Sequence, residues 1–381
     1  LDIETGLILD HEDVPQAILK NVIGTHYTST DHGLAVAGEM VADRGGYGVT
    51  GGIYKARYKF HSHQARYWAS SVSVATKNSV PGDIIVLEVH LVHPTSGQYV
   101  PMEYRQDVFD AVRAATMQGI HVVAAAGNGH QDLDSTIYAG IFDRTKRDSG
   151  SVIVGATNGS ALARASFSNY GSIVDANGWG YQVATTGYGV IFYPNNDPRQ
   201  KYTATFSGTS SATPIVTSAV GAVLSAAKEQ LGKVLKPAEM RTLLRKHGTA
   251  VTGTIGVRPD LEKLMAAIGL PKGLELRNYK GTVGKSLTLD MTGPASGFFA
   301  VLVSGKAATI QTPLGRLLLD PAGLIMVNAG GFSGSGQASL TVAIPAQPTL
   351  LYQDFYWQAA RFDAQLANPD LTSSVVSFLD K

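Results

Sequence analysis

Residues 206–214 of the chain read FSGTSSATP, and VTSAVGAVLSAA follows at residues 216–227. The small and apolar side chains of the second stretch predict a long helix over Ser211–Leu231. Ser210 then stands at the helix start, where the positive end of the helix dipole favours an oxyanion that forms beside its hydroxyl. Pro214 fits the first helical turn, because its missing N–H costs little there. The alternative interpretation is a buried helix whose Ser or Thr only caps the first turn.

Strand and helix patterns alternate through the first two thirds of the chain. Apolar runs predict strands at residues 84–89, 121–126 and 151–156, and helical spacing is found at 104–118 and 237–246. Such alternation predicts an α/β fold, in which a parallel sheet is covered by helices on both faces. Ligands of these sheets bind beyond the carboxyl ends of the strands.

The pattern changes after GLP at residues 269–271. Short strand-like runs separated by Gly and Pro turns follow to the C-terminus. They predict a small all-β sandwich, so the expected domains are residues 1–270 and 271–381. The second domain carries no catalytic constellation, and we interpret it as a module that binds an insoluble substrate or stabilises the catalytic domain.

Four stretches resemble one known family, the subtilisin-like serine proteases or subtilases. GTSSATP at 208–214 resembles the family's nucleophile signature, Gly-Thr-Ser-x-Ala-Thr-Pro. DHGLAVAG at 31–38 is similar to its His-Gly-Thr-x-Val-Ala-Gly segment, with Leu34 where the family has Thr. VVAAAGN at 122–128 is similar to its Ala-Ala-Gly-Asn strand end, and RASFSNYG at 164–171 to its Phe-Ser-Asn-Tyr-Gly block. The resemblance implies a subtilisin-like fold over the first domain.

The resemblance also implies the roles of three residues. Ser210 is the expected nucleophile, His32 the general base and Asn128 the oxyanion donor. Taken alone, a His is more often structural, and an Asn before Gly more often caps a turn. The order of the stretches along the chain favours the catalytic interpretation.

The acid of the triad departs from the family pattern. The family has Asp before Ser/Thr-Gly at the end of its first strand, and the chain begins with LDIETG at residues 1–6. Alignment on the Thr-Gly places Glu4 at the acid position, where a Glu can orient the imidazole if the backbone retreats by about one methylene. Asp2 is the alternative, because it shares the strand face of Glu4 but lies deeper in the strand.

Two strand ends are expected to form the substrate cleft, since extended peptides bind proteases by adding a strand. LEVH at residues 87–90 stands where subtilases usually carry Ser-Leu-Gly, and the opposite rim is expected just before Asn128. The predicted substrate-binding residues are Glu88, Val89, His90, Ala125, Ala126 and Gly127. A Glu88 that faces the primary pocket would favour basic side chains, whereas the alternative is an inward ion pair.

Composition excludes several functions. The 31 Lys and Arg residues nearly balance the 30 Asp and Glu residues, which leaves no electrostatic basis for binding nucleic acid or an anionic membrane. No apolar stretch is long enough to predict a membrane span. The absence of cysteine excludes disulfides and thiolate zinc sites. We expect no required cofactor, although the family resemblance allows structural Ca²⁺, and no acidic loop has a recognisable ligand spacing.

These observations predict a secreted, bacterial-type serine endopeptidase that acts on proteins or peptides and is made with an upstream pro-segment. Glu4 and the altered histidine segment leave a second hypothesis, a catalytically impaired subtilase fold that serves as a binding or scaffold protein. A different serine hydrolase, such as an esterase, is disfavoured because the chain lacks a Gly-x-Ser-x-Gly elbow and its His precedes its Ser.

Overall fold

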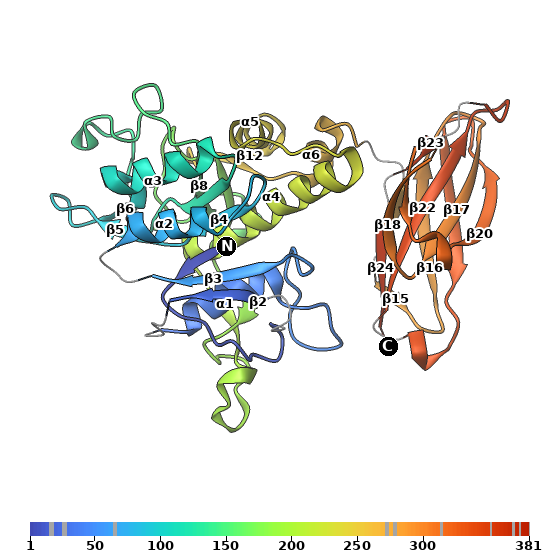
Figure 1. Cartoon of the computed structure of the whole chain (residues 1–381), viewed down its shortest axis with the longest axis horizontal. Helices are drawn as coiled ribbons and strands as arrows, with labels where there is room; N and C mark the ends of the chain where they lie inside the picture. The colour runs from blue at the N-terminus through green and yellow to red at the C-terminus, as the bar shows by residue number, and fades with distance from the viewer. Residues whose placement is uncertain are drawn as a thin grey trace. The chain divides into compact units, whose positions relative to one another are not determined.

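A computed structural model of the chain describes residues 1–14, 19–24, 29–63, 67–270, 274–276, 280–312, 315–350, 353–367, 370–372 and 375–380. The chain divides into two compact units (Figure 1). The first comprises Leu1–Ser225 and Lys233–Leu264, and the second comprises Ala226–Gly232 and Met265–Lys381. The domain boundary between residues 270 and 271 stays a prediction.

The first unit is built on a nine-stranded sheet in the order β12-β13-β9-β8-β7-β4-β1-β3-β2. Every pairing in it is parallel except β12 with β13. Its strands are β1 Asp2–Glu4, β2 Leu19–Ile23, β3 Tyr58–Ser62, β4 Ile84–Leu87, β7 His121–Ala125, β8 Val152–Thr157, β9 Ala176–Trp179, β12 Thr249–Ala250 and β13 Val257–Arg258. The predicted parallel sheet is confirmed, and the short β1 lies inside it between β3 and β4.

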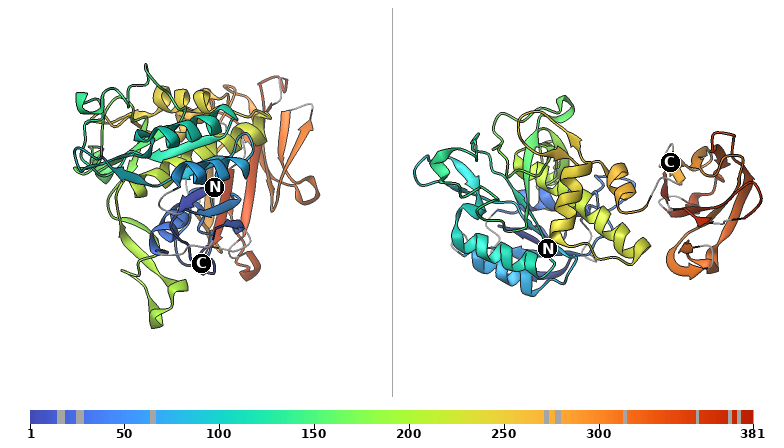
Figure 2. Two further views of the ribbon diagram at one scale, coloured as in Figure 1. Left: turned by 60° about the vertical axis from the view of Figure 1, so that its left-hand side comes forward. Right: turned by 90° about the horizontal axis from the view of Figure 1, so that it is seen from above.

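Helices cover both faces of this sheet (Figure 2). Ile85 and Leu87 of β4 pack with α2 and α3, while Val86, between them, packs with α1 on the other face. This alternation of neighbouring side chains is the normal result of a strand buried on both faces. The helices of this unit are α1 Asp31–Val41, α2 Trp68–Lys77, α3 Gln106–Met117, α4 Thr209–Leu231, whose last residues from Ala226 are counted with the second unit, and α5 Pro237–His247. A short α6 spans Leu261–Ala267 at its boundary with the second unit.

Two antiparallel hairpins stand beside the sheet. One pairs β5 (His90–Val92) with β6 (Tyr99–Pro101), and the other pairs β10 (Val183–Thr186) with β11 (Tyr202–Phe206). The hydroxyls of Thr185 and Thr186 donate to carbonyls of α1, at 2.7 and 2.6 Å. These bonds fasten the β10–β11 hairpin to the helix that carries His32.

Helix α4 begins at Thr209, two residues earlier than expected, so Pro214 lies in its second turn. The prediction of a first-turn proline is therefore wrong. Gly208 explains the early start: its φ is +106°, which glycine adopts without strain, and its carbonyl accepts the N–H of Ser211 at 3.2 Å. By length and composition α4 is the one helix among the described residues that could cross a membrane, but most of it is buried inside the protein.

From β14 onward the second unit is an all-β sandwich, as predicted. One sheet has the order β14-β16-β21 and the other β15-β24-β22-β17-β20, with β23 paired to β22 and a separate β18–β19 hairpin. Side chains of β16, such as Leu287 and Leu289, share one hydrophobic core with Val301 of β17 and Trp357 of β22. The strands are β14 Leu274–Leu276, β15 Lys280–Thr282, β16 Ser286–Thr292, β17 Phe298–Ser304, β18 Ala307–Thr312, β19 Gly315–Leu319, β20 Ile325–Gly331, β21 Gln337–Ala343, β22 Asp354–Phe362, β23 Asp370–Leu371 and β24 Val375–Asp380.

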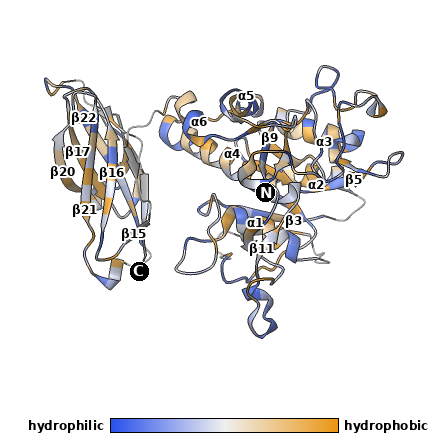
Figure 3. Cartoon of the chain, turned by 180° about the vertical axis from the view of Figure 1, so that it is seen from behind, coloured by the Kyte–Doolittle hydropathy of each residue, from blue (hydrophilic) through white to orange (hydrophobic). Residues whose placement is uncertain are grey.

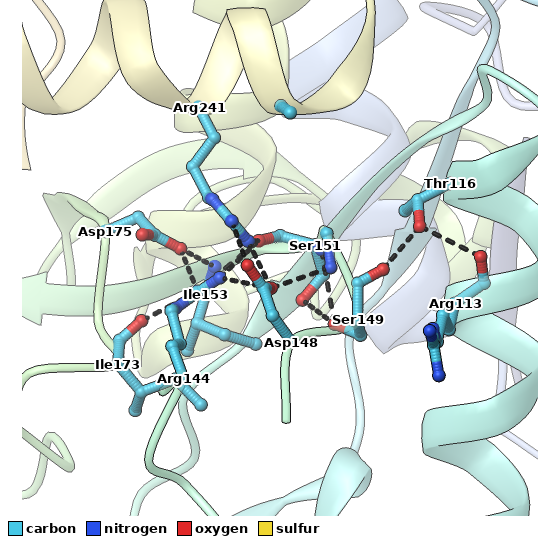
Figure 4. A network of polar contacts seen from close by, with 12 residues as sticks. Arg113, Thr116, Arg144, Asp148, Ser149, Ser151, Ile153, Ile173, Asp175 and Arg241 are labelled. Atoms are coloured by element: carbon cyan, nitrogen blue, oxygen red, sulfur yellow. Dashed lines mark hydrogen bonds and ion pairs between the residues drawn. The ribbon is translucent and has the colours of Figure 1, made fainter. Parts of the chain in front are cut away.

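An ion-pair network joins α5 to the sheet of the first unit (Figure 4). Asp175 is fully buried beside β9, and its two oxygens contact Arg144 at 2.5 Å and Arg245 of α5 at 2.7 Å. Its Oδ2 also accepts the N–H of Ile153 at 2.9 Å. Arg241 of α5 pairs with Asp148 in the same network. The buried carboxylate is thus compensated by two cations and a backbone donor.

We expect Asp175→Ala to lower the free energy of unfolding by about 3–5 kcal/mol, because it leaves the partly buried Arg144 without its main partner. Urea unfolding measures the change. The matched control is Asp107→Ala, which breaks the exposed pair with Arg105 and should cost less than about 1 kcal/mol. Equal losses in the two variants would contradict this role of Asp175.

Candidate active site

The structure brings Glu4 to His32. Strand β1 ends at Glu4 and helix α1 begins at Asp31, and Glu4 Oε1 lies 2.5 Å from His32 Nδ1. The Glu4 side chain is 2% exposed, and its other oxygen accepts the N–H of Thr5 at 3.0 Å. Asp2 instead accepts the hydroxyl hydrogen of Tyr58 at 2.5 Å. Of the two candidate acids, Glu4 is the one in contact with the ring.

Gly33 leaves the space that the contact between Glu4 and His32 requires. A Cβ at Gly33 would lie 2.2 Å from the carbonyl oxygen of Gly6 and 3.3 Å from Glu4 Cβ. Any larger residue would therefore push the start of α1 away from the end of β1. The glycine that follows His32 is needed for packing, in addition to its place in the family pattern.

The oxyanion candidate lies beside the start of α4. Asn128 Oδ1 accepts the backbone N–H of Thr209 at 2.9 Å and its hydroxyl hydrogen at 3.0 Å. These bonds fix the amide, and a Cβ at Gly208 would lie 3.1 Å from Asn128 Nδ2 and 3.6 Å from the Ser210 nitrogen. Within the part of the chain that the structure describes, neither nitrogen has a hydrogen-bond acceptor. Two donors, Asn128 Nδ2 and the Ser210 N–H, thus lie beside Gly208.

His32 contacts the strand that leads into the Ser210 segment. The edge of the His32 ring meets the Phe206 ring at a centroid distance of 5.6 Å, and Phe206 ends β11 four residues before Ser210. No hydrogen bond joins His32 to the Ser210 hydroxyl among the described residues. Catalytic contacts of this kind are often long before substrate binds and shorten in the complex. Ser210 is 8% exposed, so its hydroxyl lies in a largely enclosed position.

The pKa of His32 is raised above its ordinary value. Burial opposes the charged ring and acts to lower the pKa, but the Glu4 carboxylate and its hydrogen bond to Nδ1 outweigh that effect. A general base must be neutral before it accepts a proton. Function that depends on His32 should therefore decline as the pH falls through this raised pKa.

We expect Glu4→Gln to lower the pKa of His32, because burial is then no longer opposed by a carboxylate. Titration of the imidazole signals by NMR measures both proteins. His121 is an internal control, since burial lowers its pKa to about 4 and a backbone carbonyl, that of Leu235, contacts its ring. The same His32 pKa in both proteins, or a wild-type value below 6.5, would refute the pairing.

The two stretches predicted to bind substrate lie next to each other. Strands β4 and β7 are neighbours, and Gly127, which follows β7, would place a Cβ 3.3 Å from His90 Cβ. His90 stacks on Tyr99 with ring centroids 4.0 Å apart. Burial, and then the His32 charge, lower the pKa of His90 to about 4, so its ring is neutral at neutral pH. Val89 is half-buried between β4 and His90.

The Ala125–Gly127 rim is held in place by Asn169, whose importance sequence reasoning missed. Its side-chain Nδ2 donates to the carbonyl of Ala126 at 2.7 Å, and its backbone N–H donates to that of Gly127 at 3.0 Å. Its Oδ1 accepts the N–H of Gly129 at 3.1 Å. The signal available in the sequence was its position inside the SFSNYG stretch. Asn169 is fully buried, and the polar atoms of a buried amide need hydrogen-bond partners.

Glu88 is buried beneath this site. It is 3% exposed, and neither carboxylate oxygen has a hydrogen-bond partner among the residues that the structure describes. Burial first, and then the charges of Asp2, Glu4 and Glu39, raise its pKa well above the ordinary value. Among these described residues no cation pairs with Glu88, so the alternative of an inward ion pair is not found. A role for Glu88 in binding substrate stays a prediction.

In the described part of the chain, no group of three or more His, Asp or Glu side chains is arranged so that it could hold a metal ion. The expectation of structural Ca²⁺ is neither supported nor opposed by this observation.

Fold and contacts together define a class: an α/β protein with a buried acid–histidine pair and a serine at the start of a core helix. The chain belongs to the subtilase family, whose sequence profile matches residues 11–246. Glu4 precedes the matched range, so its assignment depends on the contact with His32. The matched range includes His32, Asn128 and Ser210.

Similar proteins agree with this membership. The extracellular serine proteinase of Thermus sp. (strain Rt41A) is 28% identical over 227 residues, covering 58% of this chain and 49% of the relative. Subtilisin DY of Bacillus licheniformis is 30% identical over 235 residues, covering 58% of this chain and 75% of the relative. A solved protease structure from Pseudoalteromonas arctica has a TM-score of 0.54 at 19% identity, covers 70% of this chain and 89% of that chain, and shows the shared fold alone. The chain spans about half the length of the Thermus proteinase.

Proposed function

We propose that the protein is a serine endopeptidase that hydrolyses peptide bonds through an acyl-enzyme on Ser210. The observation that carries the proposal is the 2.5 Å contact between Glu4 Oε1 and His32 Nδ1, in a subtilase fold that places a serine at the start of α4. A buried acid–histidine pair is how serine peptidases hold the imidazole in the tautomer that accepts a proton.

Each residue has a defined task in this mechanism. His32 Nε2 accepts the proton of the Ser210 hydroxyl, whose oxygen attacks the carbonyl carbon of the substrate. Glu4 stabilises the imidazolium that results. The new negative oxygen accepts hydrogen bonds from Asn128 Nδ2 and the Ser210 N–H, the two donors beside Gly208. His32 then gives its proton to the leaving amine. In the second half of the reaction His32 accepts a proton from water, which attacks the acyl-enzyme ester, and His32 returns a proton to the Ser210 oxygen as the acid product leaves.

The substrate is a protein or peptide in extended conformation, bound between the Val89–His90 and Ala125–Gly127 rims. The support for this placement is that the two stretches follow neighbouring parallel strands, β4 and β7, and lie side by side at Gly127 and His90. We place the protein outside the cell because the Thermus relative is described as extracellular. A pro-segment upstream of residue 1 is part of the same proposal, and its support is the family resemblance.

A catalytically silent binding or scaffold protein is the second candidate. Two observations favour it: the Glu at the acid position, and the absence of a His32–Ser210 hydrogen bond among the described residues. Chemical labelling of the serine separates the two candidates, because only an activated hydroxyl reacts rapidly with a fluorophosphonate.

We expect the wild-type protein to be labelled at Ser210 by a fluorophosphonate probe and to hydrolyse casein, and Ser210→Ala to lose both activities. Mass spectrometry of the labelled peptide locates the modified residue, and release of acid-soluble peptides measures hydrolysis. The matched control is Ser73→Ala, which removes an exposed hydroxyl from α2 and should retain both activities. A folded wild-type protein without labelling or hydrolysis would favour the scaffold hypothesis.

A further inference from the structure

The segment between β10 and β11 exposes a continuous group of large apolar side chains. Residues 187–193 read GYGVIFY, and 194–201 return as PNNDPRQK. The hairpin projects from its unit, yellow-green in Figure 1, and carries an apolar and a hydrophilic stretch in Figure 3. Its exposed members, between 37% and 60% accessible, are Tyr188, Val190, Ile191, Phe192 and Tyr193. Grouped exposed apolar side chains of this kind mark binding surfaces more often than chance.

The hairpin is fixed at its base. The backbone N–H of Tyr202 donates to the carbonyl of Phe192 at 3.0 Å, which extends the β10–β11 pairing toward the tip. On the returning side, the carbonyl of Arg199 accepts the N–H of Glu12 at 3.0 Å. The apolar side chains are therefore presented on a supported backbone.

Both ends of the hairpin are anchored on the residue before His32. Asp31 Oδ1 accepts the N–H of Tyr188 at 3.2 Å and lies 3.1 Å from Lys201 Nζ. The ring of Tyr188 meets that of Phe206 at a centroid distance of 5.9 Å, and Phe206 in turn meets His32. A continuous row of rings thus leads from the candidate general base to the hairpin.

The proton that His32 gives to the leaving amine indicates which part of a bound substrate lies beside this hairpin. His32 must give a proton to the amine that leaves, so the substrate residues that follow the scissile bond lie on the His32 side of Ser210. Asn128, which would bind the carbonyl oxygen, contacts the start of α4 instead. The hairpin, anchored beside His32, borders the leaving-group side.

We propose that residues 188–193 bind apolar side chains on the amine side of the scissile bond. This proposal rests on the proposed function and adds a substrate class to it: peptides with large apolar residues directly after the cleaved bond. A lipid surface is a poorer occupant, because the cations of the hairpin are already paired. Arg199 contacts Asp197 at 2.6 Å and Lys201 contacts Asp31, whereas membrane-binding segments present unpaired basic residues beside their apolar face.

The test compares two internally quenched peptides that are identical up to the scissile bond and continue with Leu-Phe or with Ser-Gly. Wild-type protein should have the higher kcat/KM for the Leu-Phe peptide. In Ile191→Ser/Phe192→Ser the ratio of the two kcat/KM values should fall by about tenfold, mainly through KM, because two apolar contacts are lost. Val190→Ser is a second variant with one exposed side chain changed, and its ratio should fall by a smaller factor. Met117→Ser, an exposed apolar residue at the end of α3, should leave the ratio unchanged.

The outcomes separate the two proposals. Cleavage of both peptides with the same ratio in wild type and variants overturns the hairpin proposal and leaves the endopeptidase intact. A wild-type protein that cleaves neither peptide and takes no fluorophosphonate label overturns both. Gel filtration and sedimentation with anionic vesicles accompany the assay. If the double variant loses self-association or vesicle binding while its peptide ratio is unchanged, the hairpin serves that other partner and the substrate proposal fails.

Discussion

The contact between Glu4 and His32 depends on how closely α1 can begin against the end of β1. Gly33 sets that distance, because a Cβ there would collide with the carbonyl oxygen of Gly6 at 2.2 Å. Strand β1 is only three residues long, yet it is paired on both sides, with β3 and β4. The carboxylate therefore comes from a strand that is held on both sides within the sheet.

The electrostatics around this pair follow from burial. Asp2 and Glu88 lie near Glu4, and Glu39 lies near Glu88. Burial raises the pKa of all three: that of Asp2 to about 7, and those of Glu39 and Glu88 well above the ordinary value. The cause is the cost of burying a carboxylate in its charged form. Glu4 touches the His32 ring and has the larger effect on the His32 pKa, and Asp2 adds a smaller effect in the same direction.

Most of the fold could be predicted from the sequence, because alternating apolar runs and helical spacing reflect a sheet that is buried on both faces. The start of α4 could not, since it depends on the positive φ of Gly208, which moves Pro214 into the second turn. The sequence left two directions open for Glu88, toward the primary pocket or inward, because the residue lies just beyond the end of β4, where strand alternation no longer fixes the side chain. The order of the family-like stretches located His32, Asn128 and Ser210, whereas the choice between Asp2 and Glu4 needed the three-dimensional contact.

The most direct measurement of the central claim is kcat for casein-derived peptides in Glu4→Gln compared with Asp2→Asn, each shown by circular dichroism to be folded. Because Glu4 touches the imidazole and Asp2 contacts Tyr58, the account predicts a loss of about 10³–10⁴-fold in the first variant and less than about tenfold in the second. Near-full activity in Glu4→Gln, with the large loss in Asp2→Asn, would contradict it.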